Sequence, residues 1–266
     1  MIPAELLAIV FGMLVGSFLN VCILRLPLGE SIVTPRSKCP SCRTVLGPAE
    51  LVPVASWLIQ RGRCRHCAAR ISPRYALVEI LTGSVFWFVY VAYVTHQDYS
   101  TAATFLVFYC ALIVITFIDL DHFLILDVIT YPGMIAGMLL SLWGHDPLTG
   151  VRPSARLAES FQGLVIGGGI LWLIQFLGTL WYRRQGLAAM GLGDVKFAAF
   201  SGAFLGPRME SAALLYAVFI GGASAIVFIL AGKKGRKDYV PFGPSLALGA
   251  AIAPYFGDWL ISRYGF

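Results

Sequence analysis

The sequence predicts an all-α protein that crosses a membrane about eight times and carries one small polar domain. Three observations predict this class. Hydrophobic residues make up 58% of the chain and charged residues 13%, whereas an ordinary soluble domain is about half apolar and about a quarter charged. The apolar residues form blocks close to the roughly 20 residues that a helix needs to cross a bilayer. The one long polar stretch contains paired cysteines.

The apolar blocks predict the helices in order along the chain. The first block, 5–24, follows no basic residue and has no small-residue cleavage site, so we expect a retained helix and no removed signal peptide. Pro132 predicts a tilted or broken fourth helix. The further helices are expected at 76–95, 101–118, 128–144, 157–182, 190–207, 210–231 and 243–262. The resulting organisation is a first helix in residues 1–24, a polar domain in 25–75 and a membrane domain in 76–266.

The basic residues predict the orientation of the helices. If residues 25–75 face the cytosol, alternation of eight helices places 119–127, 183–189 and 232–242 on the same side. These four segments hold fifteen Arg and Lys residues, and the opposite side holds four. This asymmetry is typical of cytosolic loops. We expect the basic residues to lie near anionic lipid headgroups. We expect no nucleic-acid partner, because no stacking aromatic residues interleave with the charges.

Two CxxC pairs, 21 residues apart, lie in the polar segment. Two such pairs supply four thiolates, which suits tetrahedral structural zinc. Bound zinc would also stabilise a segment too short for an ordinary core. A redox pair or unliganded thiols are the alternatives, and His66 is a less favoured substitute ligand. Cys22 and Cys110 are expected to be small helix- or lipid-facing residues. The expected ligands are Cys39, Cys42, Cys64 and Cys67.

Two acidic motifs lie at helix ends. Asp119 ends the predicted third helix, and Asp194 begins the sixth after Gly191 and Gly193. The predicted topology places both aspartates at one membrane face, where two carboxylates can share a proton and activate water. Helix dipoles favour Asp194 as the base and Asp119 as the acid. The alternative is a tight helix start capped by Asp194, with Asp119 as a solvated residue at the interface.

The whole chain resembles the bacterial prepilin peptidase family, also called type IV leader peptidases. The matching pieces occur in the same order from one end of the chain to the other, and they include both cysteine pairs. The other pieces are Gly16–Val21, Arg25–Pro27, Pro53–Leu58, Arg61–Arg63, Arg74–Tyr75, Val78–Glu79, Asp119–His122, Gly191–Lys196 and Pro241–Pro244.

This resemblance implies a membrane aspartic protease of the bacterial inner membrane. Members of the family remove the basic leader from prepilins or pseudopilins at the cytosolic face, and many also N-methylate the new N-terminus with S-adenosylmethionine. The resemblance implies Asp119 and Asp194 as the catalytic pair, with Asp121 and Asp127 as supporting residues. It identifies residues 25–75 with the cytosolic zinc domain of the family. The methyl-donor site and the oligomeric state are left open.

Three rival functions fit parts of the sequence. Carboxylates beside glycine-interrupted helices also occur in proton- or ion-coupled transporters. We find no inverted repeat, however, and both aspartates are expected at one face of the membrane and not at its midplane. A non-enzymatic zinc-containing scaffold of a secretion system is the second rival. A protease that cleaves transmembrane helices is the third, and the cysteine domain favours the prepilin branch over it.

Overall fold

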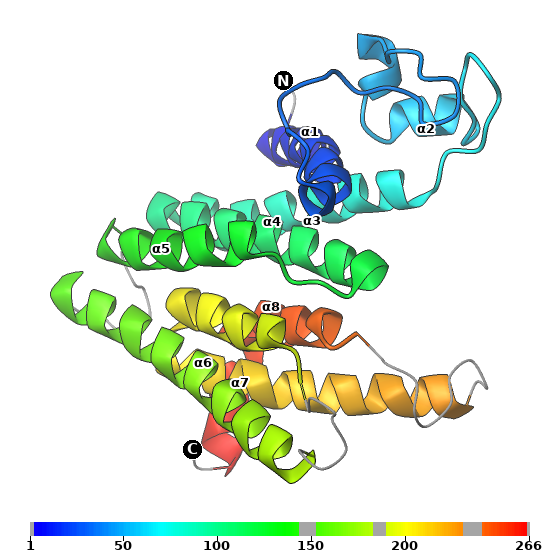
Figure 1. Cartoon of the computed structure of the whole chain (residues 1–266). Helices are drawn as coiled ribbons and strands as arrows, with labels where there is room; N and C mark the ends of the chain where they lie inside the picture. The colour runs from blue at the N-terminus through cyan, green and yellow to red at the C-terminus, as the bar shows by residue number, and fades with distance from the viewer. Residues whose placement is uncertain (1–2, 144–152, 183–189, 231–240, 265–266) are drawn as a thin grey trace. The chain divides into compact units, whose positions relative to one another are not determined.

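The computed structural model describes residues 3–143, 153–182, 190–230 and 241–264. These residues form helices and no β-strand, apart from two isolated bridges, which confirms the all-α class. Three short 3-10 helices are η1 (Leu26–Leu28), η2 (Pro48–Leu51) and η3 (Val94–His96). The α-helices, labelled in Figure 1, are α1 (Ala4–Arg25), α2 (Ala55–Ile59), α3 (Arg74–Ala92), α4 (Tyr99–His122), α5 (Asp127–Trp143), α6 (Pro153–Tyr182), α7 (Leu192–Leu230) and α8 (Gly243–Tyr264).

Each of the eight predicted segments is helical in the structure. Five described helices are long and apolar enough to cross a membrane, α5 is apolar but shorter, and α8 is not among the five. The number of eight crossings is therefore not confirmed. Two of the loops on which the predicted orientation depends, 183–189 and most of 232–242, lie outside the described residues.

Two helices differ from the prediction in where they break. The segments 190–207 and 210–231 are the halves of α7, which leaves helical geometry at Gly206 (φ 71°, ψ 174°), directly before Pro207. Glycine adopts positive φ at little cost, and proline cannot continue a helix from the preceding turn. Figure 1 shows the two halves as separate rods. In contrast, α5 runs unbroken through Pro132, although an interior proline removes one backbone hydrogen bond of the helix.

The chain divides into two compact units, Met1–Val114 and Ile115–Phe266. In the first unit, α1 packs along α3. A Cβ atom on Gly12 would lie 2.6 Å from Cβ of Phe86, and one on Gly16 would lie 2.8 Å from Cα of Glu79. Small residues at such spacing let two membrane helices approach closely. The side-chain amide of Asn20 also donates a hydrogen bond to the carbonyl of Tyr75 at 3.0 Å.

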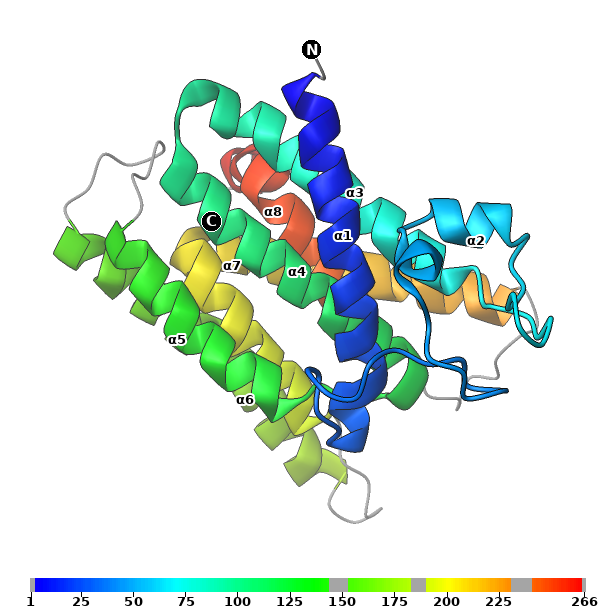
Figure 2. The same ribbon diagram turned by 90° about the horizontal axis from the view of Figure 1, so that it is seen from above.

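In the second unit, α5, α6 and α7 lie side by side, as both views show (Figures 1 and 2). Gly163 of α6 faces Gly202 of α7 so closely that neither position has room for a Cβ atom. Nearby, the hydroxyl of Ser160 donates a hydrogen bond to the carbonyl of Ala203 at 2.6 Å. The first half of α7, which carries Asp194 in its first turn, therefore packs closely against α6.

Candidate active site and candidate metal centre

Asp119 is held by the beginning of another helix. It lies near the end of α4 and is 5% exposed. Its Oδ2 accepts a hydrogen bond at 3.0 Å from the backbone N–H of Gly243, the first residue of α8. A Cβ atom on Gly243 would lie 2.5 Å from the same oxygen. Glycine is therefore required for the carboxylate to approach the free N–H groups at this helix N-terminus.

Asp194 lies in the first turn of α7 and is 7% exposed. Its backbone N–H donates a hydrogen bond to the carbonyl of Gly191 at 3.3 Å. The two carboxylates are close enough for the charge of Asp119 to act on Asp194. The structure thus brings together the two aspartates that the sequence singled out. Helix dipoles do not separate the roles of the two aspartates, however, because Asp119 also faces a helix N-terminus.

The two acidic motifs are joined by an ion pair. Nζ of Lys196, two residues after Asp194, lies 2.6 Å from Oδ1 of Asp127. Asp127 is the first residue of α5, where the helix dipole favours negative charge. The same ammonium group lies 5.4 Å from the centre of the Tyr131 ring. Asp127 was expected to support the site, and the structure supplies its partner. The sequence did not indicate this pairing.

Glu210 is a buried acid that sequence analysis missed. It is 0% exposed, and Oε1 accepts a hydrogen bond from the hydroxyl of Ser201 at 2.9 Å. Oε2 has no hydrogen-bond partner among the described residues. Gly167 of α6 leaves room for it, because a Cβ atom there would lie 2.9 Å from Cγ of Glu210. The available signal was an acid at the start of the apolar segment 210–231, since acids at membrane depth are costly.

The four predicted metal ligands meet in one cluster. Their sulfur atoms all lie within 4.8 Å of one another, and Sγ of Cys39 is 3.9 Å from Sγ of Cys67. Zn–S bonds of about 2.3 Å in a tetrahedron separate the sulfurs by about 3.8 Å. The donor set therefore fits zinc. His66 points elsewhere, because its Nε2 lies 3.2 Å from Oε1 of Glu50, and this disfavours His66 as a ligand.

Two small hairpins of matching backbone carry the cysteines. We call residues 38–45 the first knuckle and residues 63–70 the second knuckle. Each is bounded by one antiparallel bridge, Lys38 with Val45 and Arg63 with Arg70. In each, the residue after the second cysteine has a positive φ, 58° and 57° respectively. The closing bonds are Cys39 N to Thr44 O and Arg43 N to Cys39 O in the first knuckle, and Cys64 N to Ala69 O and Ala68 N to Cys64 O in the second.

Hydrogen bonds favour thiolates in both knuckles. The side chain and then the backbone of Thr44 lower the pKa of Cys42 to about 6. Backbone N–H groups of Cys67 and His66 lower the pKa of Cys64. At Cys67 a backbone hydrogen bond acts in the same direction, but burial and the neighbouring sulfurs outweigh it and raise the pKa to about 11. Full ionisation of the cluster therefore needs a cation, which is how a thiolate metal site behaves.

Known proteins match both parts of the chain. Residues 10–93 match the bacterial peptidase A24 N-terminal domain, and residues 106–226 match the type IV leader peptidase family. A relative from Aeromonas hydrophila is 33% identical over 97% of this chain and 92% of its own length. One from Bacillus subtilis is 32% identical over 96% and 95%.

A third relative, from Myxococcus xanthus, is 38% identical over 86% of this chain, which spans 64% of that relative's length. All three are named prepilin leader peptidase/N-methyltransferase. No solved structure matches the chain. With similarity along nearly its full length and both aspartates gathered at one site, the chain belongs to the type IV leader peptidase family.

Proposed function

We propose that this protein cleaves the basic leader from prepilins or pseudopilins and N-methylates the new N-terminus. The observation that carries the proposal is the buried pair Asp119 and Asp194, each at a helix terminus and within electrostatic reach of the other. The names of the relatives support both activities. The transporter alternative has no supporting observation.

Cleavage uses water and two carboxylates. One ionised aspartate takes a proton from water, and the oxygen of that water attacks the scissile carbonyl. The other aspartate gives its proton to the leaving nitrogen, so that the peptide bond breaks and no covalent enzyme intermediate forms. The N–H of Gly243 donates a hydrogen bond to one oxygen of Asp119, and we assign the second oxygen to the attacking water. Gly191 and Gly193 leave the backbone before Asp194 open to an extended substrate.

The cysteine cluster holds structural zinc in this proposal. All four positions are sulfur, so no coordination position is left for a catalytic water. Zinc would neutralise the thiolates and fix the two knuckles relative to each other. The catalytic work therefore belongs to the aspartates.

No residue is assigned to S-adenosylmethionine. The hollow formed by the second knuckle is lined by Arg61, Arg63 and Arg70. The methyl donor carries a carboxylate, which guanidinium groups attract, and also a sulfonium and an amino group, which they repel. The charges of the hollow therefore do not assign it to the donor.

The proposed location is the bacterial inner membrane, with the cysteine domain and the aspartates facing the cytosol. The support is the excess of basic residues in the segments assigned to that side. A basic leader remains in the cytosol while the apolar helix that follows it lies in the bilayer. The scissile bond of such a substrate lies at the cytosolic interface, where the positive-inside count puts the aspartates.

The test is cleavage of a purified prepilin by the purified protein in detergent, with S-adenosylmethionine present and the product read by mass spectrometry. Asp119→Asn and Asp194→Asn are each expected to lower the cleavage rate by about 100- to 10,000-fold. Asp258→Asn is the control, because its exposed carboxylate pairs with Arg208. A mass gain of one methyl group on the new N-terminus identifies the second activity. Full cleavage by either aspartate variant would remove that residue from the mechanism.

A further inference from the structure

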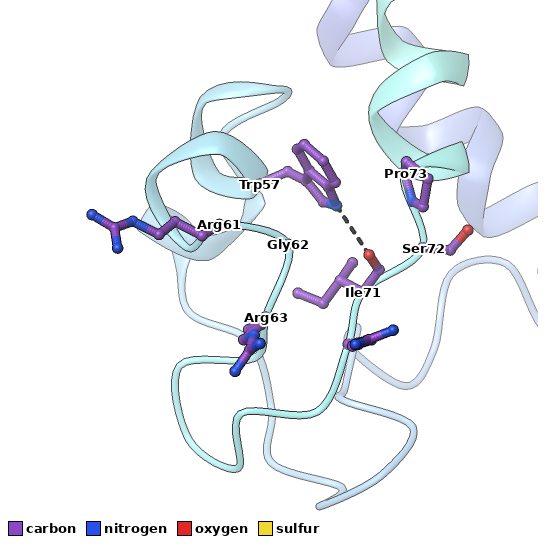
Figure 3. A pocket seen from close by; sticks show the side chains of 8 residues that line it. Trp57, Arg61, Gly62, Arg63, Ile71, Ser72 and Pro73 are labelled. Carbon is purple, nitrogen blue, oxygen red and sulfur yellow. Dashed lines mark hydrogen bonds between the residues drawn. The ribbon is translucent and has the colours of Figure 1, made fainter.

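The second knuckle borders an open hollow of about 600 Å³ that the catalytic mechanism does not use (Figure 3). Trp57 and Ile71 form facing walls, and the indole N–H donates a hydrogen bond to the carbonyl of Ile71 at 3.1 Å. The N–H of Ile71 in turn donates to the carbonyl of Gly62 at 2.7 Å. These bonds fix the backbone of the hollow without using any charged side chain.

The charge of the hollow is one-sided. Arg61, Arg63 and Arg70 line it, and no acidic residue does. In the described part of the chain, no ion pair joins these three exposed arginines to an acid. Figure 3 shows Arg61 extending outward from the rim, away from Trp57. The hollow is therefore a basic surface with an aromatic wall.

Two of these arginines lie opposite each other, an arrangement that a bound anion would stabilise. Arg63 and Arg70 are directly opposite in the antiparallel bridge of the second knuckle. Side chains at opposed positions share a face, and like charges there are destabilising. The first knuckle has Lys38 and Val45 at the equivalent positions. Two facing arginines are thus not a requirement of the knuckle backbone, and a bound anion would remove their repulsion.

We propose that this hollow binds the phosphate of an anionic phospholipid headgroup. Pro73, at its edge, directly precedes Arg74, the first residue of a helix that is long and apolar enough to cross a membrane. The hollow therefore lies at the level where α3 enters the bilayer. Anionic headgroups attract Arg and Lys at that level, and tryptophan is enriched there. A basic leader peptide would be repelled by the same charges.

The test measures binding of short-chain phosphatidylglycerol to the purified full chain in neutral detergent, by isothermal titration calorimetry. Arg63→Gln/Arg70→Gln is expected to weaken binding about 20- to 30-fold, which corresponds to about 1 kcal/mol for each arginine. The matched control is Arg36→Gln/Lys38→Gln, which removes two charges at the start of the first knuckle, outside the hollow, and is expected to change binding less than about threefold. Unchanged metal content shows that the knuckles of both variants remain folded.

Three outcomes would overturn the proposal. Equal weakening by the two double variants would mean diffuse attraction and no site. Equal binding of short-chain phosphatidylcholine would mean that the anionic headgroup is not recognised. Competition by inorganic phosphate at the concentration of the lipid would identify a free anion as the ligand. Because the readout is lipid binding, failure of this proposal is separate from failure of the proposed peptidase activity.

Discussion

The cysteine domain and the aspartate region differ in what stabilises each of them. Among residues 26–73, all of which the structure describes, only Cys39, Gly62 and Cys64 are buried. Two of these three are expected metal ligands, so almost no apolar core stabilises this domain. Asp119 and Asp194, in contrast, lie among helices that bury large apolar side chains, including Ile118 and Phe197. We therefore expect the cysteine domain to depend on a bound metal and the aspartate region to depend on helix packing.

The two regions also differ in the sequence separation between the residues that hydrogen-bond to each other. Each knuckle is closed by hydrogen bonds between residues four or five positions apart. The CxxC spacing therefore largely determines how the two cysteines of a knuckle are placed. The hydrogen bond from Gly243 to Asp119 spans 124 positions, and no local pattern encodes it. A metal site can thus be recognised from short motifs, whereas the surroundings of a catalytic pair depend on the tertiary fold.

The largest expected effect comes from removing the metal. Cys39→Ser/Cys64→Ser should abolish zinc binding and disorder residues 26–73, because structural zinc supplies about 10 kcal/mol or more of folding free energy. Zinc is measured by mass spectrometry of the purified protein, and order by limited proteolysis within the cysteine domain. Cys110→Ser, outside the cluster, is the control. A double variant that keeps its zinc and resists protease would refute the metal-held domain.

A smaller effect is expected at the glycine that contacts Asp119. The Cβ atom of Gly243→Ala would lie 2.5 Å from Oδ2 of Asp119, so the carboxylate must move. A displacement of about 1 Å at a catalytic group costs about 100-fold in rate, and prepilin cleavage should fall by that order. Gly222→Ala is the control, because no atom lies within 4 Å of its new Cβ atom. Zinc content should stay at the wild-type level in both variants.

The smallest effect is expected at the ion pair between Lys196 and Asp127. The two side chains are 28% and 55% exposed, and exposed pairs contribute about 0–1 kcal/mol. Lys196→Met and Asp127→Asn should each lower cleavage less than about fivefold, and the double variant should be no worse than either single variant. A loss of about 100-fold in the Lys196 variant alone would instead mean that its ammonium group takes part in the chemistry.

The sequence predicted the helical segments and the break near residue 207, but α5 does not break at Pro132 as was considered. Apolar blocks contain enough information to locate all eight helical segments, because membrane length and helix rise are fixed. A single proline does not reveal whether a helix breaks: α5 continues through Pro132, whereas α7 reverses where Gly206 precedes Pro207. The outcome depends on the neighbouring helices, which the local sequence does not specify.

Only part of the candidate site could be predicted from the sequence, for the same reason. The two aspartates and the four cysteines could be named from motifs and spacing. Their hydrogen-bond partners could not, because Gly243, which binds Asp119, lies on another helix 124 positions further along the chain. Glu210 was passed over for a similar reason: Ser201 and the space beside Gly167 become its neighbours only when α7 folds back on itself.

The contact between Gly243 and Asp119 also has a consequence for biosynthesis. α4 leaves the ribosome long before α8, and 119 and 243 are separated by more than a hundred residues of chain. A nascent chain that already contains both aspartates still lacks the N–H that holds one of them. Proteolytic competence therefore arrives late in translation, after α8 has been synthesised and has packed, and a truncated product that ends before Gly243 would carry the acidic motifs without a finished active site.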